Sequence, residues 1–264
     1  MMQMVEEHFA AVGGRRVRYL EAGGGWPVLL LHAFPMNADQ WRPQLERAPA
    51  GWRLVAPDVV ARPGAERVEA MAADVLELAD HLEIERAVIG GLSMGGYLTF
   101  AAYQQAPERF VGMLLANTRS AADTPDGRIG RERMIALVRD RGTSAIVDEM
   151  LPKLLGATAR RDRPDLQAEV RRIAESCSPE GVAGALAAMR DRPDSTPMLE
   201  RISCTTLVIG ADEDVVTPLA EMERMQERIP RSRFVVLRGA GHLSNLEMAD
   251  QFSRALTDFF ASRM

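Results

Sequence analysis

Short apolar runs alternate with helical patterns along this chain, and that alternation limits the possible folds more than any other feature. Eight runs have the length and composition of β-strands. They cover residues 9–12, 16–21, 28–31, 53–56, 87–90, 112–116, 206–209 and 234–237. The run at 28–31 is continuously apolar, which is typical of a strand buried on both faces. The alternation predicts an α/β fold in which helices cover both faces of an open, mostly parallel sheet.

Two local patterns support this interpretation. The double glycine Gly13-Gly14 separates the first two strand-like runs, and glycine adopts the positive φ angles that a hairpin turn needs. Apolar residues between 71 and 82 recur at spacings of four, three and four, which places them on one face of a helix.

The stretch from residue 121 to residue 198 has a different character, because it contains helical patterns and no convincing strand. The helical patterns cover residues 129–138, 146–155 and 166–173. We therefore predict a core formed by residues 1–120 and 199–264, with residues 121–198 inserted as a helical cap, or lid, over a site. The alternative is a set of extra helices with no gating role.

Charge and cysteine content exclude several classes of protein. The chain of 264 residues has a net charge of −5, whereas nucleic-acid-binding proteins normally carry a basic stripe, so we expect no nucleic-acid partner. No apolar run is long enough to span a bilayer and no signal peptide begins the sequence, so we expect no membrane association. Cys177 and Cys204 lack a metal-like spacing, which favours two reduced thiols and a cytoplasmic location. Oligomeric state is not readable from the chain.

The sharpest motif is Gly-Leu-Ser-Met-Gly-Gly at residues 91–96, directly after a strand-like run and directly before a helical pattern. A sharp turn between strand and helix exposes the hydroxyl of Ser93 at its tip and places the next backbone N–H at a helix N-terminus. Glycines two residues on either side allow strand and helix to cross closely. The motif predicts that Ser93 is a nucleophile.

A serine nucleophile needs a base, and histidine suits neutral pH. The sequence has four histidines. His8 lies in the N-terminal lead-in, His81 near the end of an amphipathic helix and His32 directly after a buried strand. His242 lies in a glycine-rich loop after the last strand-like run, where flanking glycines free the backbone to orient the ring. We predict that His242 is the base.

The base in turn needs a carboxylate to orient it. Asp212, Glu213 and Asp214 follow the strand-like run at 206–209, at the end of a strand where open α/β sheets place their catalytic groups. One of these acids is predicted to be catalytic. The order serine, acid, histidine is the one that this architecture uses.

With these motifs, the chain resembles the α/β-hydrolase superfamily along essentially its whole length. The resemblance is closest to small bacterial esterases, enol-lactonases and cofactor-free haloperoxidase-like hydrolases. It implies an eight-stranded, mostly parallel sheet with a helical lid, and no cofactor or metal. In that family the catalytic acid usually lies four residues before a proline, which selects Asp214, with Asp212 as the second choice.

The resemblance also covers the segment His32-Ala33-Phe34-Pro35, which looks like the family's H-G-F-P turn. It implies that the backbone N–H groups of Phe34 and Met94 stabilise the oxyanion, each contributing about 3 kcal/mol. His32 would hold that turn, and Trp41 matches a tryptophan often found there in a packing role.

The resulting hypothesis is a serine hydrolase that cleaves small carboxylic esters through an acyl-enzyme formed on Ser93. Lactone or enol-lactone opening and perhydrolysis use the same triad and stay open as alternatives, and a ligand-binding protein without catalysis is a further one. Candidate substrate-lining residues are His32, Trp41, Met134, Leu137, Met150, Leu154 and Met189. Ordinary helix packing would explain the aliphatic residues of the cap equally well.

Overall fold

The computed structural model describes residues 2–261, and its centre is a single sheet of eight strands. The strands are β1 (Glu6–Val12), β2 (Arg15–Gly23), β3 (Trp26–Leu31), β4 (Trp52–Pro57), β5 (Ala87–Leu92), β6 (Phe110–Ala116), β7 (Thr205–Ala211) and β8 (Ser232–Leu237). Their order across the sheet is β1-β2-β4-β3-β5-β6-β7-β8. Strand β2 is antiparallel to both its neighbours, and the pairs from β4 to β8 are parallel. The predicted α/β architecture is confirmed.

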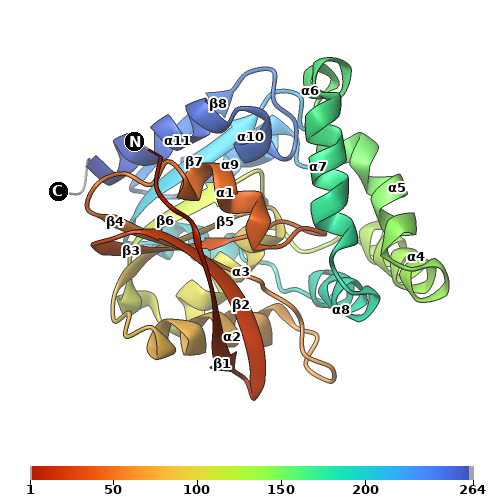
Figure 1. Cartoon of the computed structure of the whole chain (residues 1–264), viewed down its shortest axis with the longest axis horizontal. Helices are drawn as coiled ribbons and strands as arrows, with labels where there is room; N and C mark the ends of the chain where they lie inside the picture. Colours follow the sequence, from red (N-terminus) through yellow and green to blue (C-terminus); the bar gives the residue numbers. More distant parts are fainter. Residues whose placement is uncertain (1, 262–264) are drawn as a thin grey trace.

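Helices cover both faces of the sheet (Figure 1). The core helices are α1 (Arg42–Leu45), α2 (Val68–His81), α3 (Met94–Gln105), α9 (Leu219–Arg228), α10 (Ser244–Glu247) and α11 (Ala249–Ala261). Apolar residues of α2, α3 and α9 bury one face, and those of α1 and α11 bury the other. No helix among the described residues is long and apolar enough to cross a membrane.

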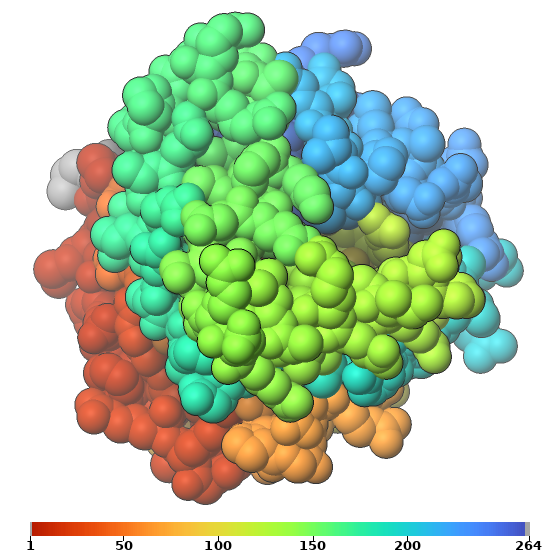
Figure 2. All heavy atoms as spheres, turned by 90° about the vertical axis from the view of Figure 1, so that its right-hand side faces the viewer, coloured from red at the N-terminus to blue at the C-terminus, as the bar shows by residue number. Residues whose placement is uncertain are grey.

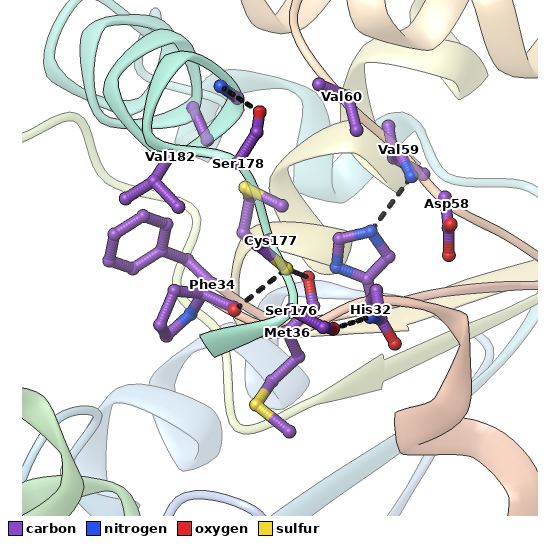
Figure 3. Close-up of a pocket in the computed structure, with 15 residues that line it drawn as sticks. His32, Phe34, Met36, Asp58, Val59, Val60, Ser176, Cys177, Ser178 and Val182 are labelled. Carbon is purple, nitrogen blue, oxygen red and sulfur yellow. Dashed lines mark hydrogen bonds between the residues drawn. The ribbon is translucent and has the colours of Figure 1, made fainter. Parts of the chain in front are cut away.

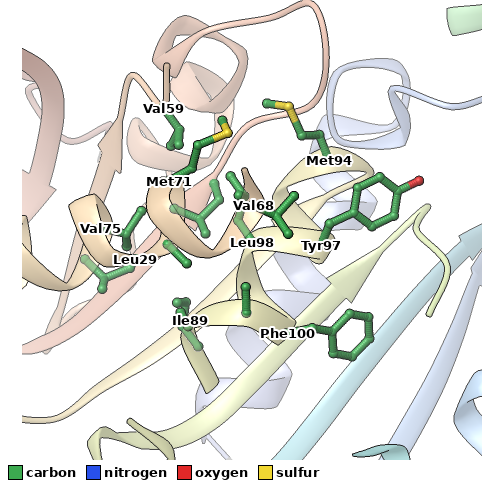
Figure 4. Packing of buried hydrophobic residues seen from close by; sticks show 14 of the residues in the cluster. Leu29, Val59, Val68, Met71, Val75, Ile89, Met94, Tyr97, Leu98 and Phe100 are labelled. Carbon is green, nitrogen blue, oxygen red and sulfur yellow. The ribbon is translucent and has the colours of Figure 1, made fainter. Parts of the chain in front are cut away.

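The continuously apolar run at 28–31 has the burial that its composition predicts. Leu29 and Leu31 point into the cluster under α2 and α3, whereas Val28 and Leu30 point into the cluster on the opposite face. Side chains alternate between the two faces of a strand, so a central strand needs apolar residues at every position. Figure 4 shows Leu29 of β3 packed with side chains of α2 and α3 in the first of these clusters.

Five helices lie between β6 and β7 in the chain and stand together at one end of the sheet (Figure 1). They are α4 (Pro125–Arg141), α5 (Thr143–Leu154), α6 (Ala157–Asp162), α7 (Pro164–Glu175) and α8 (Pro179–Arg190). We call these five helices the cap. They fall inside the stretch 121–198 for which the sequence predicts helices and no strands.

Candidate active site

Ser93 occupies a strained turn between β5 and α3. Its backbone has φ 56° and ψ −111°, and only Glu83 and Asn117 among the other described non-glycine residues have a positive φ. Such a conformation persists only where the surrounding structure enforces it. Here the Ser93 N–H donates to the carbonyl of Ala116, and the Ser93 carbonyl accepts from the hydroxyl of Thr118. Residues at the end of β6 and just after it therefore hold the turn in this conformation.

The glycines around Ser93 allow the close crossing of strand and helix that the sequence predicts. A Cβ atom on Gly95 would lie 2.1 Å from the carbonyl oxygen of Leu31, and one on Gly91 would lie 2.4 Å from the carbonyl carbon of Gly95. Both distances are far inside van der Waals contact with backbone atoms that cannot move aside. No residue with a side chain fits at either position.

His242 and Asp214 form a buried pair, with Asp214 in the loop after β7 and His242 in the loop after β8. Nδ1 of His242 lies 2.9 Å from Oδ2 of Asp214, and the two residues are 1% and 6% exposed. Oδ1 of Asp214 accepts the backbone N–H groups of Val216 and Thr217, and Oδ2 also accepts the amide of Asn117. Each oxygen of this carboxylate therefore accepts two hydrogen bonds, which fix the carboxylate that the ring of His242 contacts.

The surroundings of Asp214 keep it ionised. Burial raises the pKa of this carboxyl, but the charge of His242 and the hydrogen bonds from His242, Thr217 and Asn117 lower it by more. Its pKa therefore lies below the ordinary value, and the carboxylate is present at neutral pH to accept the Nδ1–H of the ring.

The other two acids of the loop have different partners. Asp212 is exposed and accepts the backbone N–H of Gly239. Glu213 accepts the backbone N–H and the hydroxyl of Thr158, in the cap. Of the three acids that the sequence left open, only Asp214 is hydrogen-bonded to His242.

Ser93 and His242 line one pocket of about 360 Å³ beneath the cap. Met134, Met150 and Met189 of the cap line the same pocket, and their role in binding a substrate stays a prediction. Figure 2 shows the cap helices in green over this end of the molecule, with a hollow between them and the blue segments after β7.

Four expected lining residues lie outside this pocket, and one of them, His32, lines a different cavity. Trp41 is wholly buried and packs against Phe252, with ring centroids 5.9 Å apart. Leu154 is wholly buried in the core cluster under α11, and Leu137 packs against the cluster under α2 and α3. Apolar spacing shows that a helical residue is buried, but it does not distinguish a neighbour in the core from a substrate.

Met94 directly follows Ser93 in the chain, and Phe34 lines the same pocket as Ser93. Met94 is the first residue of α3, so its N–H has no acceptor within the helix. Phe34 follows β3, and its loop is held because Ala33 donates its N–H to the side chain of Gln40. Both residues are buried, and Phe34 lines the pocket with Ser93. Two donors at these places could receive the charge of an oxyanion.

His32 holds this loop from the other side. Nδ1 lies 2.9 Å from the carbonyl oxygen of Ala33, and Nε2 accepts the backbone N–H of Val59 at 2.9 Å. These partners require a neutral ring with its proton on Nδ1, and burial lowers the pKa of His32 in the same sense. His32 therefore connects two loops.

A second cavity of about 160 Å³ also borders this loop (Figure 3). His32 and Phe34 of the loop and Met94 of α3 line it from the core, and Cys177 and Val182 line it from the cap side. The thiol of Cys177 lies 3.4 Å from the carbonyl oxygen of Pro35, and burial raises its pKa to about 12. This thiol is protonated at neutral pH and is a poor nucleophile.

Sequence reasoning missed three polar residues around the site. Asn117 directly follows β6, has φ 44° and bridges Asp214 to the hydroxyl of Ser244. Arg119 lines the same pocket as Ser93 and His242. Glu247 accepts the backbone N–H groups of Gly156 and Gly241. For Asn117 and Arg119 a signal existed, because both follow a predicted strand at the end where catalytic groups gather.

Residues 2–261 contain no group of three or more His, Cys, Asp or Glu side chains arranged to hold a metal ion.

Comparison with known proteins gives consistent results. The alpha/beta hydrolase family matches residues 28–255. 3-Oxoadipate enol-lactonase 2 of Acinetobacter baylyi is 32% identical over 193 residues, which are 73% of this chain and 70% of that protein. A thermophilic esterase from Thermogutta terrifontis, solved with malate bound, is 35% identical with a TM-score of 0.92, over 97% of this chain and 98% of that one. The enol-lactonase from Burkholderia xenovorans LB400 is 27% identical with a TM-score of 0.88, over 96% and 100%.

Proposed function

Because this chain belongs to the alpha/beta hydrolase family and is a carboxylic ester hydrolase, we propose that it cleaves small carboxylic esters through an acyl-enzyme on Ser93. The observation that carries the proposal is the buried hydrogen bond between His242 and Asp214. His242 lines the same pocket as Ser93, whose backbone is strained. Family membership alone would leave the residues open.

In the proposed first step, the hydroxyl of Ser93 attacks the ester carbonyl while Nε2 of His242 takes its proton. Because Nδ1 of the ring donates to Asp214, Nε2 is the nitrogen left with a free lone pair. The carboxylate of Asp214 then stabilises the imidazolium that forms. The ring then gives the proton to the leaving alcohol. In the second step, the ring takes a proton from water, the water attacks the acyl-enzyme, and the ring returns the proton to the oxygen of Ser93 as the acid leaves.

In this proposal, the backbone N–H groups of Phe34 and Met94 donate hydrogen bonds to the carbonyl oxygen and stabilise the negative charge that develops on it. Both are backbone donors on buried, fixed segments, so they need not reorganise when the charge develops. The N-terminus of α3 adds its partial positive charge at the same point.

Lactone opening is the second candidate reaction, and the similarity to two enol-lactonases favours it. A lactone is an internal ester, so the same triad would open it with the alcohol remaining on the acyl group. In both cases we propose that residues 121–198 act as a cap over residues 1–120 and 199–264, and that the partner is a small molecule held beneath it.

The first test is Ser93→Ala with p-nitrophenyl butyrate as substrate. We expect turnover to fall by at least about a thousandfold, because the nucleophile is removed while the oxyanion donors remain. A fluorophosphonate probe should label the parent protein at Ser93 and leave the variant unlabelled, as mass spectrometry of the labelled peptide would show.

Ser253→Ala is the matched control, since Ser253 lies on α11 outside the pocket and its buried hydroxyl has no partner. It should keep both turnover and labelling. Ester hydrolysis that survives in Ser93→Ala would refute the acyl-enzyme.

A further inference from the structure

The catalytic pocket carries more positive than negative charge. Its lining includes two acidic side chains, Asp123 and Glu149. It also includes four basic ones, namely Arg119, Arg131, Arg133 and Lys153. A surplus of this kind in a cleft attracts anions, because the low-dielectric walls concentrate the field.

Both acids are already paired. Asp123 binds Arg131 at 3.1 Å and the buried Arg192 at 2.7 Å. Burial raises the pKa of Asp123, but these two guanidinium groups lower it by more, so the carboxylate stays charged. Glu149 pairs with Arg133. These contacts leave Arg119 and Lys153 as the pocket's cations without a salt bridge, within residues 2–261.

Arg119 is the more deeply placed of the two. It lies three residues after β6 and is half-buried, whereas Lys153 is exposed on α5. Nη2 of Arg119 donates to the carbonyl of Val216, and its Nε is buried without a partner. A half-buried guanidinium with one neutral acceptor and no carboxylate is poorly compensated, since it has given up water without gaining an opposite charge.

We propose that Arg119 binds a carboxylate group of the substrate, so that the esters or lactones cleaved at Ser93 are those of small dicarboxylic acids. This inference rests on the proposed function, because it needs the ester carbonyl at Ser93. Arg119, Ser93 and His242 line one pocket, so a short molecule can reach the guanidinium and the nucleophile together. The planar guanidinium matches a carboxylate better than an ammonium group does. Lys153 adds charge at the exposed side.

Two isosteric esters provide the test. Monoethyl succinate carries a carboxylate where ethyl levulinate carries a methyl ketone, so they differ mainly in charge. For the parent protein we expect a KM for monoethyl succinate at least about tenfold below that for ethyl levulinate, which is the effect of one charge-assisted hydrogen bond. In Arg119→Gln the KM for monoethyl succinate should rise by about tenfold or more, with ethyl levulinate changed less than about twofold.

The values of kcat separate binding from positioning. A carboxylate held away from the reacting atoms contributes equally in the ground and transition states, so Arg119→Gln should leave kcat for both esters nearly unchanged. If kcat instead falls equally for both esters and their KM values stay alike, Arg119 acts only by holding the loop of Val216, and the proposal is wrong.

Arg172→Gln is the charge-matched control. Arg172 lies on α7, pairs with Glu169 and does not line this pocket. It should change both KM values by less than about twofold, which separates a local contact from the overall charge of the cap.

A second measurement does not depend on turnover. Succinate should slow fluorophosphonate labelling of Ser93 in the parent protein and have no effect on labelling of Arg119→Gln, whose labelling without succinate also shows that it is folded. Equal protection of the two proteins would overturn the carboxylate site while leaving the proposed function intact. Absence of labelling at Ser93 in the parent protein would instead refute the proposed function.

Discussion

Two strained residues stand at neighbouring strand ends, and both serve the same small region. Ser93 after β5 and Asn117 after β6 each have a positive φ, which costs free energy in a residue with a side chain. Asn117 tolerates the conformation better than most residues because its short amide bonds locally. Its N–H donates to Ile209 of β7, and its side chain donates to Asp214. Both strained residues therefore place a side chain at the proposed triad, Ser93 as its nucleophile and Asn117 in contact with Asp214.

The role of Asp214 gives a prediction about a single atom. In Asp214→Asn the amide cannot accept from Nδ1–H of His242 as a carboxylate does, so the ring is held in the wrong tautomer or left without a countercharge. We expect kcat for p-nitrophenyl butyrate to fall by about 10⁴-fold with little change in KM. Steady-state kinetics at pH 8 would measure both.

Asp212→Asn is the control for that variant. Asp212 is exposed and its carboxylate accepts the N–H of Gly239, away from His242, so kcat should change less than about threefold. A large loss in Asp212→Asn and a small one in Asp214→Asn would exchange the two roles.

At the scale of elements, the cap and the loop of His242 are joined closely. The N–H of Leu243 donates to the carbonyl of Leu154, the last residue of α5. Gly156 and Gly241 lie so near each other that a Cβ on Gly241 would be 2.1 Å from the Gly156 nitrogen. Glu247 of α10 accepts the backbone N–H groups of both glycines, at 2.8 and 2.9 Å. These contacts couple the position of this part of the cap to that of the loop that carries His242.

Glu247 makes the contact between the cap and the loop of His242 dependent on pH. Burial raises the pKa of Glu247 to about 7, although the two N–H groups and His242 oppose the shift. In the unfolded chain the group releases its proton at lower pH, so between about pH 4.5 and 7 the folded state holds a proton that the unfolded state has lost. Stability contributed by this group therefore falls as pH rises through that window, by up to about 3 kcal/mol, and is constant above it.

Glu247→Gln should remove this dependence, because the neutral amide keeps an oxygen for the two N–H groups. Relative to the parent protein, its free energy of unfolding should rise by up to about 3 kcal/mol between pH 4.5 and pH 8, as measured by urea unfolding. Glu213→Gln is the opposite control, since hydrogen bonds from Thr158 lower the pKa of Glu213 and its stabilisation is lost as pH falls. Parallel stability curves for Glu247→Gln and the parent protein would contradict the prediction.

At the scale of the whole molecule, one buried arginine connects both ends of the cap to the core. Arg192 is 3% exposed and donates to the carbonyl of Ala121 and the carboxylate of Asp123, which precede α4. It also donates to the carbonyl of Met189 in α8 and lies over the ring of Tyr97 in α3, 4.1 Å from the centroid. The two chain segments that enter and leave the cap are thus tied at one point.

Arg192→Met should destabilise the protein by about 3–5 kcal/mol, because it leaves the carboxylate of Asp123 and the carbonyls of Ala121 and Met189 with fewer partners. Urea unfolding at pH 7 would measure the loss. Arg190→Met, which removes a salt bridge to the exposed Asp191 beside it, should cost about 1 kcal/mol or less. Equal losses for the two variants would mean that Arg192 does not connect the cap to the core.

The sequence by itself determined the architecture of this protein. Strand-like runs, the helix stripe between residues 71 and 82 and the turn at Ser93 are recorded within short stretches, because backbone geometry and the alternation of burial are local properties. The sheet accordingly has a strand at each of the eight predicted places. Ser93 and His242 were also singled out locally, and their catalytic roles stay predictions.

The tertiary structure decided what depends on distances between remote segments. Three acids lie side by side in the sequence, and only the fold turns Asp214 toward His242. The unpaired charge of Arg119 is visible only once the partners of the other pocket residues are known, and the burial of Glu247 depends on two glycines 85 residues apart. Pairing and desolvation are properties of the assembled chain, so no local pattern records them.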